Sequence, residues 1–398
     1  MNSALRSKPD MRIGISTSVI QRGKTGIAQY LFALLRAFLP YAGENHFVLF
    51  VLEEDLPLFA FAKEKMQLVP VSEKFRPPIK NILWHQRALP QLVRDWDLDV
   101  LHVPSYRRML WPRACRLVAT IHDLAPFRVP KKYSASRMFY GRVVARRLAQ
   151  RQDAVIAISE NTAQDVHQFF DVPLPRLHVI HNGLEHDRFF PGSREQAQAE
   201  MAARHQLDKP FFLYVARLEH PGKNHVRLIS AFNQFKAATG SDWQLVFGGS
   251  DWHGAEAIHA AARQSPFASE IRFLGFVSNE DLPNLYRAAD VFVYPSLYEG
   301  FGMPPVEAMA CGCPVICSTN GSLGEVVGNA AAIADPQDVN SIANQLGLLA
   351  TDAKLRERLR QAGFARAKQF DWNRTARETL SLYERVAQSN EKILAAGH

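Results

Sequence analysis

The stretch that decides the fold is "PSLYEGFGMPPVEAMACG", residues 295–312, which contains two carboxylates, Glu299 and Glu307, around paired glycines and paired prolines. It follows an apolar run, 291–294, that is typical of a buried strand. The glycines permit backbone conformations closed to other residues. The prolines suit the first turn of a helix, and the last glycine ends that helix. The stretch therefore predicts a strand–loop–helix unit with Glu299 in the loop and Glu307 in the first helical turn.

Similar apolar runs alternate with amphipathic segments along most of the chain. The predicted strands are 12–16, 47–52, 67–71, 99–103, 116–121, 154–159, 177–180, 211–216, 244–248, 271–274, 291–294, 314–317 and 331–334. The predicted helices are 26–39, 134–150, 161–170, 225–238, 279–288 and 338–349. Several of the strands are apolar throughout, as expected when helices cover both faces of a parallel sheet.

The alternation pauses once, over residues 182–210, where glycine and proline precede a polar helical run. We therefore place a domain boundary near residue 190. The predicted fold is α/β, with two doubly wound, Rossmann-like domains, 1–190 and 191–370, that face each other across a cleft. Segment 371–398 is predicted to be a helix that crosses back to the first domain. Ligands of such sheets bind at the carboxyl ends of the strands.

Composition and cysteine content indicate a globular cytoplasmic protein. The 398 residues are 47% hydrophobic and 22% charged, with no apolar run of 18 residues and no apolar leader in the first ten. The cysteines do not match a zinc-binding spacing, and we interpret them as small buried side chains in a reducing compartment. They are Cys115, Cys311, Cys313 and Cys317.

Positive charge is concentrated in the first half. Residues 1–190 hold 27 Lys and Arg against 17 Asp and Glu, a net charge of +10, whereas the remainder carries −2. This asymmetry favours an anionic partner, with a solvated basic face as the alternative. No nucleic-acid-binding module is recognisable, so nucleic acid is not expected.

The residues around the two acids suit a ligand rich in hydroxyls. A carboxylate accepts hydrogen bonds from paired sugar hydroxyls, and the backbone amides of Phe301, Gly302 and Met303 at the helix entrance favour negative charge. A nucleotide sugar has hydroxyls at both ends and a diphosphate between them. The alternative for Glu307 is that it only complements the helix dipole.

Two cations follow another predicted strand. Arg217 and Lys223 flank a Pro-Gly turn, and Asn224 is predicted to cap the next helix. Two such cations can neutralise a diphosphate without a metal ion, and a solvated strand end is the alternative. The Asp-x-Asp sequence Asp97 to Asp99 precedes a strand, and we assign it to the surface.

Several segments together resemble family 4 retaining glycosyltransferases, which have the GT-B fold. They are "PSLYEGFGMPPVEAMACGCPVICS", "YVARLEHPGKNH", "IHDLAPFRVP", "AISENTAQDV" and "VIHNGLEHDRF", within about residues 12–385. The "IHDL" segment is similar to that of mannosyltransferase-like members. The resemblance implies that Arg217 and Lys223 hold the donor diphosphate and stabilise the departing nucleotide. It implies that the leaving phosphate takes the proton of the acceptor.

The first domain is expected to contribute His122 and Gly26. The resemblance places His122 beside the donor sugar, where it positions a hydroxyl, and we pair it with Glu299 as a catalytic candidate. Gly26 lies in a glycine-containing loop that approaches the donor, although the family pairs two glycines where this chain has Thr25-Gly26. This loop is not a dinucleotide fingerprint.

The segment 137–151 predicts an amphipathic helix. Its apolar positions, expected to face inward, are Phe139, Val143, Val144 and Leu148, and its outward arginines are Arg142, Arg146, Arg147 and Arg151. With Lys131 and Lys132 nearby, it suits an anionic membrane or a lipid-diphosphate acceptor. A core helix with a soluble back is the alternative.

We expect a retaining, metal-independent hexosyltransferase without a cofactor, using GDP-mannose or a UDP-hexose as donor. Its acceptor is expected to be a glycan or a lipid-linked glycan in surface polysaccharide synthesis, at the inner face of the membrane or in the cytoplasm. Two other interpretations remain: a sugar-binding protein without catalysis, and another GT-B enzyme such as a sugar-nucleotide epimerase.

Overall fold

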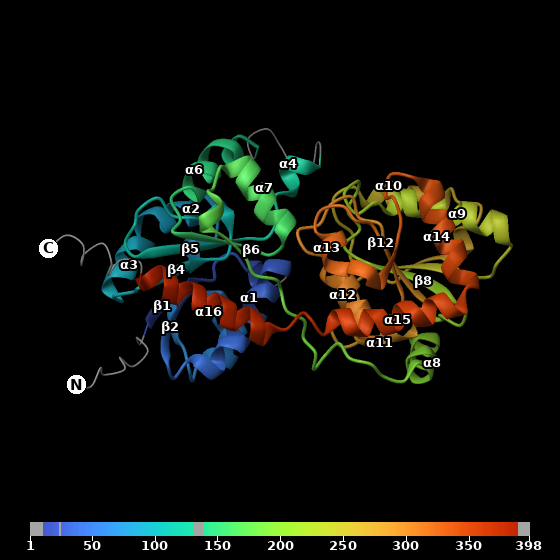
Figure 1. Ribbon diagram of the computed structural model, residues 1–398, viewed down its shortest axis with the longest axis horizontal. Helices are drawn as coiled ribbons and strands as arrows, with labels where there is room; N and C mark the ends of the chain where they lie inside the picture. The colour runs from blue at the N-terminus through green and yellow to red at the C-terminus, as the bar shows by residue number, and fades with distance from the viewer. Residues whose placement is uncertain (1–10, 24, 130–137, 389–398) are drawn as a thin grey trace, which may run out of the picture. The chain divides into compact units, whose positions relative to one another are not determined.

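The computed structural model describes residues 11–23, 25–129 and 138–388. These residues form two compact units (Figure 1). The first contains residues 11–127, 138–183 and 372–388, and the second contains residues 128–129 and 184–371. Lys131 and Lys132 lie outside the described residues. The chain divides between Gly183 and Leu184 because the backbone amide of Leu184 already donates to the carbonyl of Phe370, 3.2 Å away in the second unit.

The first unit is built on a parallel sheet of seven strands in the order β3-β2-β1-β4-β5-β6-β7. The strands are β1 (Met11–Ser16), β2 (Asn45–Leu52), β3 (Gln67–Val71), β4 (Val100–Val103), β5 (Arg116–Ile121), β6 (Ala154–Ala157) and β7 (Leu177–Val179). The helices are α1 (Gly26–Phe38), α2 (Pro78–Arg87), α3 (Leu89–Asp95), α4 (Ala125–Arg128), α6 (Arg146–Ala149), α7 (Glu160–Phe170) and α16 (Trp372–Gln388). The last of these, drawn in red, packs on α1, β4 and β5 (Figure 1).

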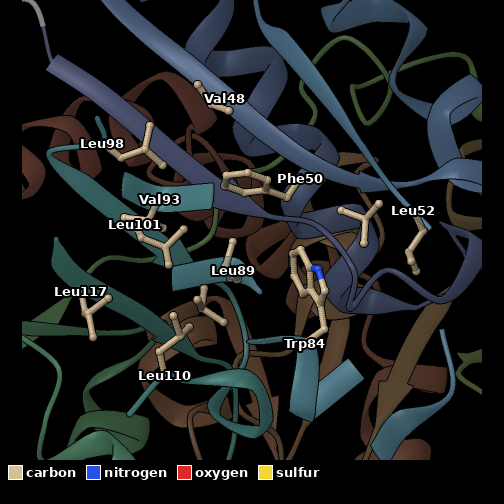
Figure 2. Packing of buried hydrophobic residues seen from close by; sticks show 12 residues of the cluster. Val48, Phe50, Leu52, Trp84, Leu89, Val93, Leu98, Leu101, Leu110 and Leu117 are labelled. Atoms are coloured by element: carbon tan, nitrogen blue, oxygen red, sulfur yellow. The ribbon is translucent and has the colours of Figure 1, made fainter. Parts of the chain in front are cut away.

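A hydrophobic cluster fills one side of this sheet (Figure 2). Phe50 of β2 meets Trp84 of α2 with ring centroids 6.3 Å apart in an edge-to-face contact. Leu101 of β4 and Leu89 of α3 are fully buried in the same cluster. All four residues of β4 are buried, which explains why this strand has no alternation of polar and apolar positions.

The second unit is a parallel sheet of six strands in the order β10-β9-β8-β11-β12-β13. The strands are β8 (Phe211–Val215), β9 (Gln244–Gly248), β10 (Ile271–Phe273), β11 (Val291–Tyr294), β12 (Val315–Cys317) and β13 (Ala331–Ile333). The helices are α8 (Arg194–His205), α9 (His225–Thr239), α10 (Ala255–Arg263), α11 (Leu282–Ala288), α12 (Met303–Ala310), α13 (Leu323–Val327), α14 (Val339–Thr351) and α15 (Ala353–Ala367).

Every predicted strand is present, and the predicted fold class is confirmed: both sheets are parallel and doubly wound, as in the Rossmann fold. Cys311, Cys313 and Cys317 are buried as predicted, whereas Cys115 is half-buried. Within the described ranges, no helix has both the length and the apolar character that crossing a membrane requires.

In the predicted amphipathic helix 137–151, here called the basic helix, Leu148 is buried as predicted, but the inward positions of Phe139 and Val144 are wrong. Residues Tyr140–Ala145 form a π-helical turn, and this turn changes the helical repeat. The side chains of Phe139 and Val144 are consequently exposed, at 64% and 37%. Gly141 and Ala145 face the core instead.

Candidate functional site

The strand order of the second unit reverses between β8 and β11, which lie side by side in the sheet. In an open parallel sheet, ligands bind outside the carboxyl ends of the strands at this point. The loop after β8 contains Arg217 and Lys223, and the loop after β11 contains Glu299. The topology therefore places three of the predicted site residues on two neighbouring loops.

Asn224 fixes these two loops to each other. It occupies the position before α9 but makes no side-chain cap, so the predicted capping role is wrong. Its backbone is left-handed, with φ of 66°, and this turns the side-chain amide toward the second loop. The amide donates to the carbonyls of Pro295, at 2.9 Å, and Pro336, at 2.7 Å. The amide of Leu297 also donates to the carbonyl of Gly222 at 3.0 Å.

One oxygen of Glu299 is the centre of a compact hydrogen-bond cluster. Lys223 Nζ donates to Glu299 Oε1 at 2.6 Å, Ser296 Oγ donates to the same atom at 2.6 Å, and the Tyr294 hydroxyl donates at 3.0 Å. In the part of the chain that the structure describes, no residue donates to the second oxygen, Oε2. This oxygen remains available to accept hydrogen bonds from a ligand.

The surroundings of Glu299 keep it ionised. Its side chain is 14% exposed and that of Lys223 is 18% exposed. Burial by itself raises the pKa of Glu299, but the charge of Lys223 and the three hydrogen bonds outweigh burial and hold this pKa below its ordinary value. The cluster therefore presents an ionised acceptor beside a fixed ammonium group.

The loop after β12 fixes the backbone of Glu299. The amide and the hydroxyl of Ser322 both donate to the Glu299 carbonyl, each at 3.1 Å. The Ser322 hydroxyl also lies 2.8 Å from the carbonyl of Phe301, whose ring packs edge-on against Phe370 with centroids 5.5 Å apart. Gly321 approaches so closely that a Cβ there would lie 2.4 Å from the Glu299 carbonyl oxygen.

Gly302 precedes Met303, the first residue of α12, and its backbone conformation requires glycine. Its φ is 101°, and an added Cβ would lie 2.4 Å from Cδ2 of Leu323. We expect Gly302→Ala to lower the free energy of unfolding by about 1–3 kcal/mol because alanine is strained at such a φ. Gly26→Ala is the matched control, since a Cβ there meets no atom within 4 Å. Urea unfolding that showed equal losses for both variants would contradict this.

Glu307 belongs to a second polar contact, separate from the Glu299 cluster. The helix begins at Met303, so Glu307 lies beyond the first turn. The prediction that placed Glu307 within the first turn is therefore wrong. Tyr286 of α11 donates its hydroxyl to Glu307 Oε2 at 2.9 Å. Burial raises the pKa of Glu307 to about 7, although this hydrogen bond and the charge of Arg188 act in the opposite direction. A glutamate that only complemented a helix dipole would have a lowered pKa.

The raised pKa of Glu307 predicts a pH-dependent stability. The folded protein retains a proton that the unfolded chain releases near the ordinary pKa of 4.5. The free energy of unfolding should therefore fall as the pH rises from 4.5 to about 7, by at most about 1.4 kcal/mol per pH unit for one proton. Glu307→Gln should remove this contribution. Urea unfolding of both proteins between pH 5 and 8 checks it; identical slopes would refute it.

Arg217 is an open cation at the end of β8. Its guanidinium carbon lies 4.7 Å from the ring centroid of Trp252, whose side chain is 57% exposed. Among the described residues, no ion pair includes Arg217. An exposed arginine with no carboxylate partner retains its donors for an anionic ligand.

The first unit contains His122 and Gly26. His122 follows β5, and burial lowers its pKa to about 4, so the ring is neutral near pH 7. Its Nε2 is buried without a hydrogen-bond partner among the described residues. Gly26 is the first residue of α1, whose cap is the Thr25 side chain, which accepts from the amide of Ala28.

The structure thus brings Lys223 and Glu299 into direct contact and places Arg217 on the same loop as Lys223. Glu307 makes its hydrogen bond to Tyr286 instead of joining this cluster. Tyr294 and Ser296 donate to Glu299 but were not predicted from the sequence. Tyr294 directly precedes the stretch 295–312, and Ser296 lies within it. A tyrosine at the end of a strand has no spacing that marks it as a functional residue.

Comparison with known proteins defines the class. The family described as "Glycosyl transferases group 1" matches residues 196–366, and "Glycosyltransferase Family 4" matches residues 25–188. With two Rossmann-like units, the chain is a glycosyltransferase of the GT-B fold. It belongs to glycosyltransferase family 4.

Its relatives include mannosyltransferases. The chain is 29% identical to the O-antigen chain mannosyltransferase B of Escherichia coli, over 94% of this chain and 100% of that protein. It is 31% identical to the serotype-specific mannosyltransferase WbdA of Escherichia coli, over 70% of this chain but only 34% of that longer protein. The sucrose-phosphate synthase of Thermosynechococcus elongatus has the same fold, with a TM-score of 0.76, 20% identity, and coverage of 95% and 100% of the two chains.

Proposed function

We propose that this glycosyltransferase transfers a hexose from a nucleotide-sugar donor to a glycan or lipid-linked acceptor. The hexose that we propose is mannose. The observation that carries the proposal is the Lys223–Glu299 contact at the strand reversal of the second unit, with Oε2 of Glu299 open. A nucleotide sugar presents a diphosphate for cations and hydroxyls for carboxylates. The sequence identity between this chain and two mannosyltransferases of Escherichia coli supports mannose as the transferred sugar and a polysaccharide as the acceptor.

The roles of the residues follow from their chemistry. Lys223 and Arg217 bind the donor diphosphate and stabilise the charge that develops on it as the nucleotide departs. Glu299 Oε2 accepts from hydroxyls of the sugar, and Glu307 accepts from hydroxyls of the ribose. The amides of Gly302 and Met303 favour the negative charge of the donor.

The proposed reaction retains the configuration of the sugar and needs no metal. The bond from the anomeric carbon to the diphosphate oxygen breaks, and the acceptor oxygen bonds to the same face of that carbon. The proton of the acceptor passes to the departing diphosphate oxygen. Fixed cations at the diphosphate supply the charge stabilisation that a metal ion provides in other transferases.

The basic helix suits contact with an anionic membrane surface. The exposed side chains of Phe139 and Val144 lie among the exposed arginines Arg142, Arg146 and Arg147. Apolar side chains beside arginines are the pattern of a helix that lies in a membrane interface. We therefore propose that this helix contacts the membrane surface peripherally, where the enzyme meets a lipid-linked acceptor.

Two measurements test the proposed function. A thermal-shift screen with GDP-, UDP- and ADP-sugars should show one base that raises the melting temperature most. Proton NMR of that donor with a mannose-containing acceptor and EDTA should then show a new glycoside with the anomeric configuration of the donor.

The same two measurements distinguish the proposed transferase from the other two interpretations. A sugar-binding protein would stabilise with donor but form no glycoside. An epimerase would change the donor sugar in the absence of acceptor. An inverted anomeric centre would contradict retention, and loss of turnover in EDTA would contradict metal independence.

A further inference from the structure

Two arginines lie near the point where the strand order of the first sheet reverses. The reversal is between β1 and β4, which pair with each other. The single 3₁₀ turn Tyr106–Arg108 comes shortly after β4 and contacts both α2 and the π-helical turn of the basic helix. In an open parallel sheet, ligands bind outside the carboxyl ends of the strands at such a reversal. The first unit therefore has a candidate binding position of its own.

Arg108 is held between α2 and the basic helix by hydrogen bonds to uncharged groups. Its Nε donates to Asn81 Oδ1, in α2, at 2.5 Å, and its Nη1 donates to the carbonyl of Arg107 at 3.2 Å. The hydroxyl of Tyr140, in the basic helix, donates to the same carbonyl at 3.0 Å. The other terminal nitrogen, Nη2, makes no hydrogen bond to any residue that the structure describes. It therefore remains available to donate to a ligand.

This position has positive charge without a carboxylate to balance it. Arg108 is half-buried, and no Asp or Glu of the described ranges forms an ion pair with it. Burial lowers the pKa of Arg108 and the charge of Arg107 lowers it further, whereas Tyr140 acts in the opposite direction. The neighbouring His85 is neutral, because burial lowers its pKa to about 3. A partly buried cation of this kind is stabilised when a ligand supplies the negative charge.

The flanking surface suits an anion that has an apolar chain. Ile79 and Leu83 lie one helical turn apart on α2 and are 75% and 46% exposed. Lys80 and Arg87 are exposed on the same helix, and residues 74–90 contain no Asp or Glu. The basic helix also exposes apolar and basic side chains. Both elements that contact the 3₁₀ turn therefore have the surface of a helix that lies in a membrane interface.

We propose that Arg108, with Arg107 beside it, binds the diphosphate that joins the acceptor glycan to its lipid. Nη2 of Arg108 donates to a phosphate oxygen, and the charges of two arginines match those of a diphosphate. The lipid chain then enters the membrane beside α2 and the basic helix. This inference rests on the proposed function for the glycan, whereas the arginine site itself rests on contacts within the first unit.

Two soluble acceptors that differ only in the diphosphate test the site. Both contain the same mannose-terminated glycan and the same short alkyl chain, which is joined to the glycan through a diphosphate in one and directly in the other. The KM of the wild-type enzyme should be about ten- to a hundredfold lower for the diphosphate acceptor, as expected for a hydrogen bond between charged groups. Equal KM values for the two acceptors would overturn the proposal.

Replacing Arg108 by methionine should remove this difference, because methionine keeps much of the side-chain length but has no charge. Arg108→Lys retains a charge and should keep part of the difference. Arg94→Met is the matched control: Arg94 is exposed on α3 and donates to Gln91 at 2.7 Å, so this variant should prefer the diphosphate acceptor as wild type does. Circular dichroism checks that each variant is folded. A folded Arg108→Met variant with the wild-type preference would contradict the assignment.

Vesicle binding distinguishes the acceptor from an ordinary membrane lipid as the source of the phosphate. Wild type and Arg108→Met should sediment equally with phosphatidylglycerol vesicles that contain no acceptor. Weaker sedimentation of the variant, together with an unchanged preference between the two acceptors, would assign Arg108 to lipid headgroups and overturn the proposal.

The arginine site and the proposed function fail in different ways. The diphosphate acceptor is titrated into the protein while the donor site is filled with the nucleoside diphosphate whose base the thermal-shift screen identifies. Tighter binding to wild type than to Arg108→Met supports the arginine site even if no sugar is transferred, and in that case only the proposed function fails. Equal affinities overturn the arginine site, whether or not the protein transfers sugar.

Discussion

Replacing Lys223 by methionine is expected to reduce sugar transfer by about 10²–10³-fold, as loss of a fixed transition-state donor does in other enzymes. Methionine keeps much of the length of the side chain but removes the ammonium group that faces Glu299 and the proposed diphosphate. Without this charge, burial dominates at Glu299 and raises the pKa of its carboxyl group. Initial rates at saturating donor, measured by release of nucleoside diphosphate, test the expectation.

The same variant should also lose stability, because it leaves a mostly buried carboxylate without its cation. We expect about 3 kcal/mol less free energy of unfolding, the lower end of the range for breaking a buried ion pair. Lys209→Met is the matched control: Lys209 pairs with Glu270 at 3.3 Å, but its side chain is 41% exposed. The control should change stability by less than about 1 kcal/mol and leave transfer unchanged. A Lys223 variant as active as this control would remove Lys223 from the mechanism.

Replacing Glu299 by glutamine is expected to reduce transfer by about 10²-fold, although glutamine has the same shape. Lys223, Ser296 and Tyr294 all donate to Oε1, so they hold the amide with its oxygen in that position. The NH₂ group then occupies the place of Oε2 and donates where the carboxylate accepts. A sugar hydroxyl that donates to Oε2 loses its partner and meets a second donor instead.

The loss of charge should cost about 2 kcal/mol of stability, the value of a hydrogen bond between charged groups. Glu357→Gln is the control, since Glu357 is 52% exposed and pairs with Arg360 on the surface. Rates and urea unfolding are measured on both variants. Full activity of Glu299→Gln, with its stability lowered as expected, would show that Oε2 does not contact the sugar.

The strands were predictable because their signal is local. β11 is buried along its whole length, and its uninterrupted apolar run is visible in the sequence. The helix α15 was not predicted, because many of its fifteen residues are charged and it buries only Leu359, Gly363 and Ala367. Its packing against α12 depends on tertiary contacts that no local pattern encodes.

The orientation of side chains was less predictable than the positions of the elements. Phe139 was expected to face inward because it fits an α-helical repeat, and the π-helical turn after it changes that repeat. Glu307 was expected in the first turn of its helix, but the helix begins at Met303 and the prolines lie inside it. The difference at Glu307 is a shift of one or two residues, within the ordinary uncertainty of helix boundaries.

The charged residues of the candidate site were predictable from the sequence, but the residues that hold its loops in place were not. Lys223 and Glu299 stand out by residue type and by the glycines beside them, Gly222 and Gly300. The supporting roles of Asn224 and Ser322 do not stand out, because their hydrogen bonds go to the carbonyls of Pro295 and Glu299, and Asn224 was predicted only as a helix cap. Backbone partners of this kind leave no residue pattern in a sequence.

A crystal structure with the stabilising nucleotide sugar tests the central claim most directly. We predict diphosphate oxygens within hydrogen-bond distance of both Lys223 Nζ and the Arg217 guanidinium, with a sugar hydroxyl on Glu299 Oε2. A donor bound elsewhere, with these three groups making no contact to it, would contradict the account.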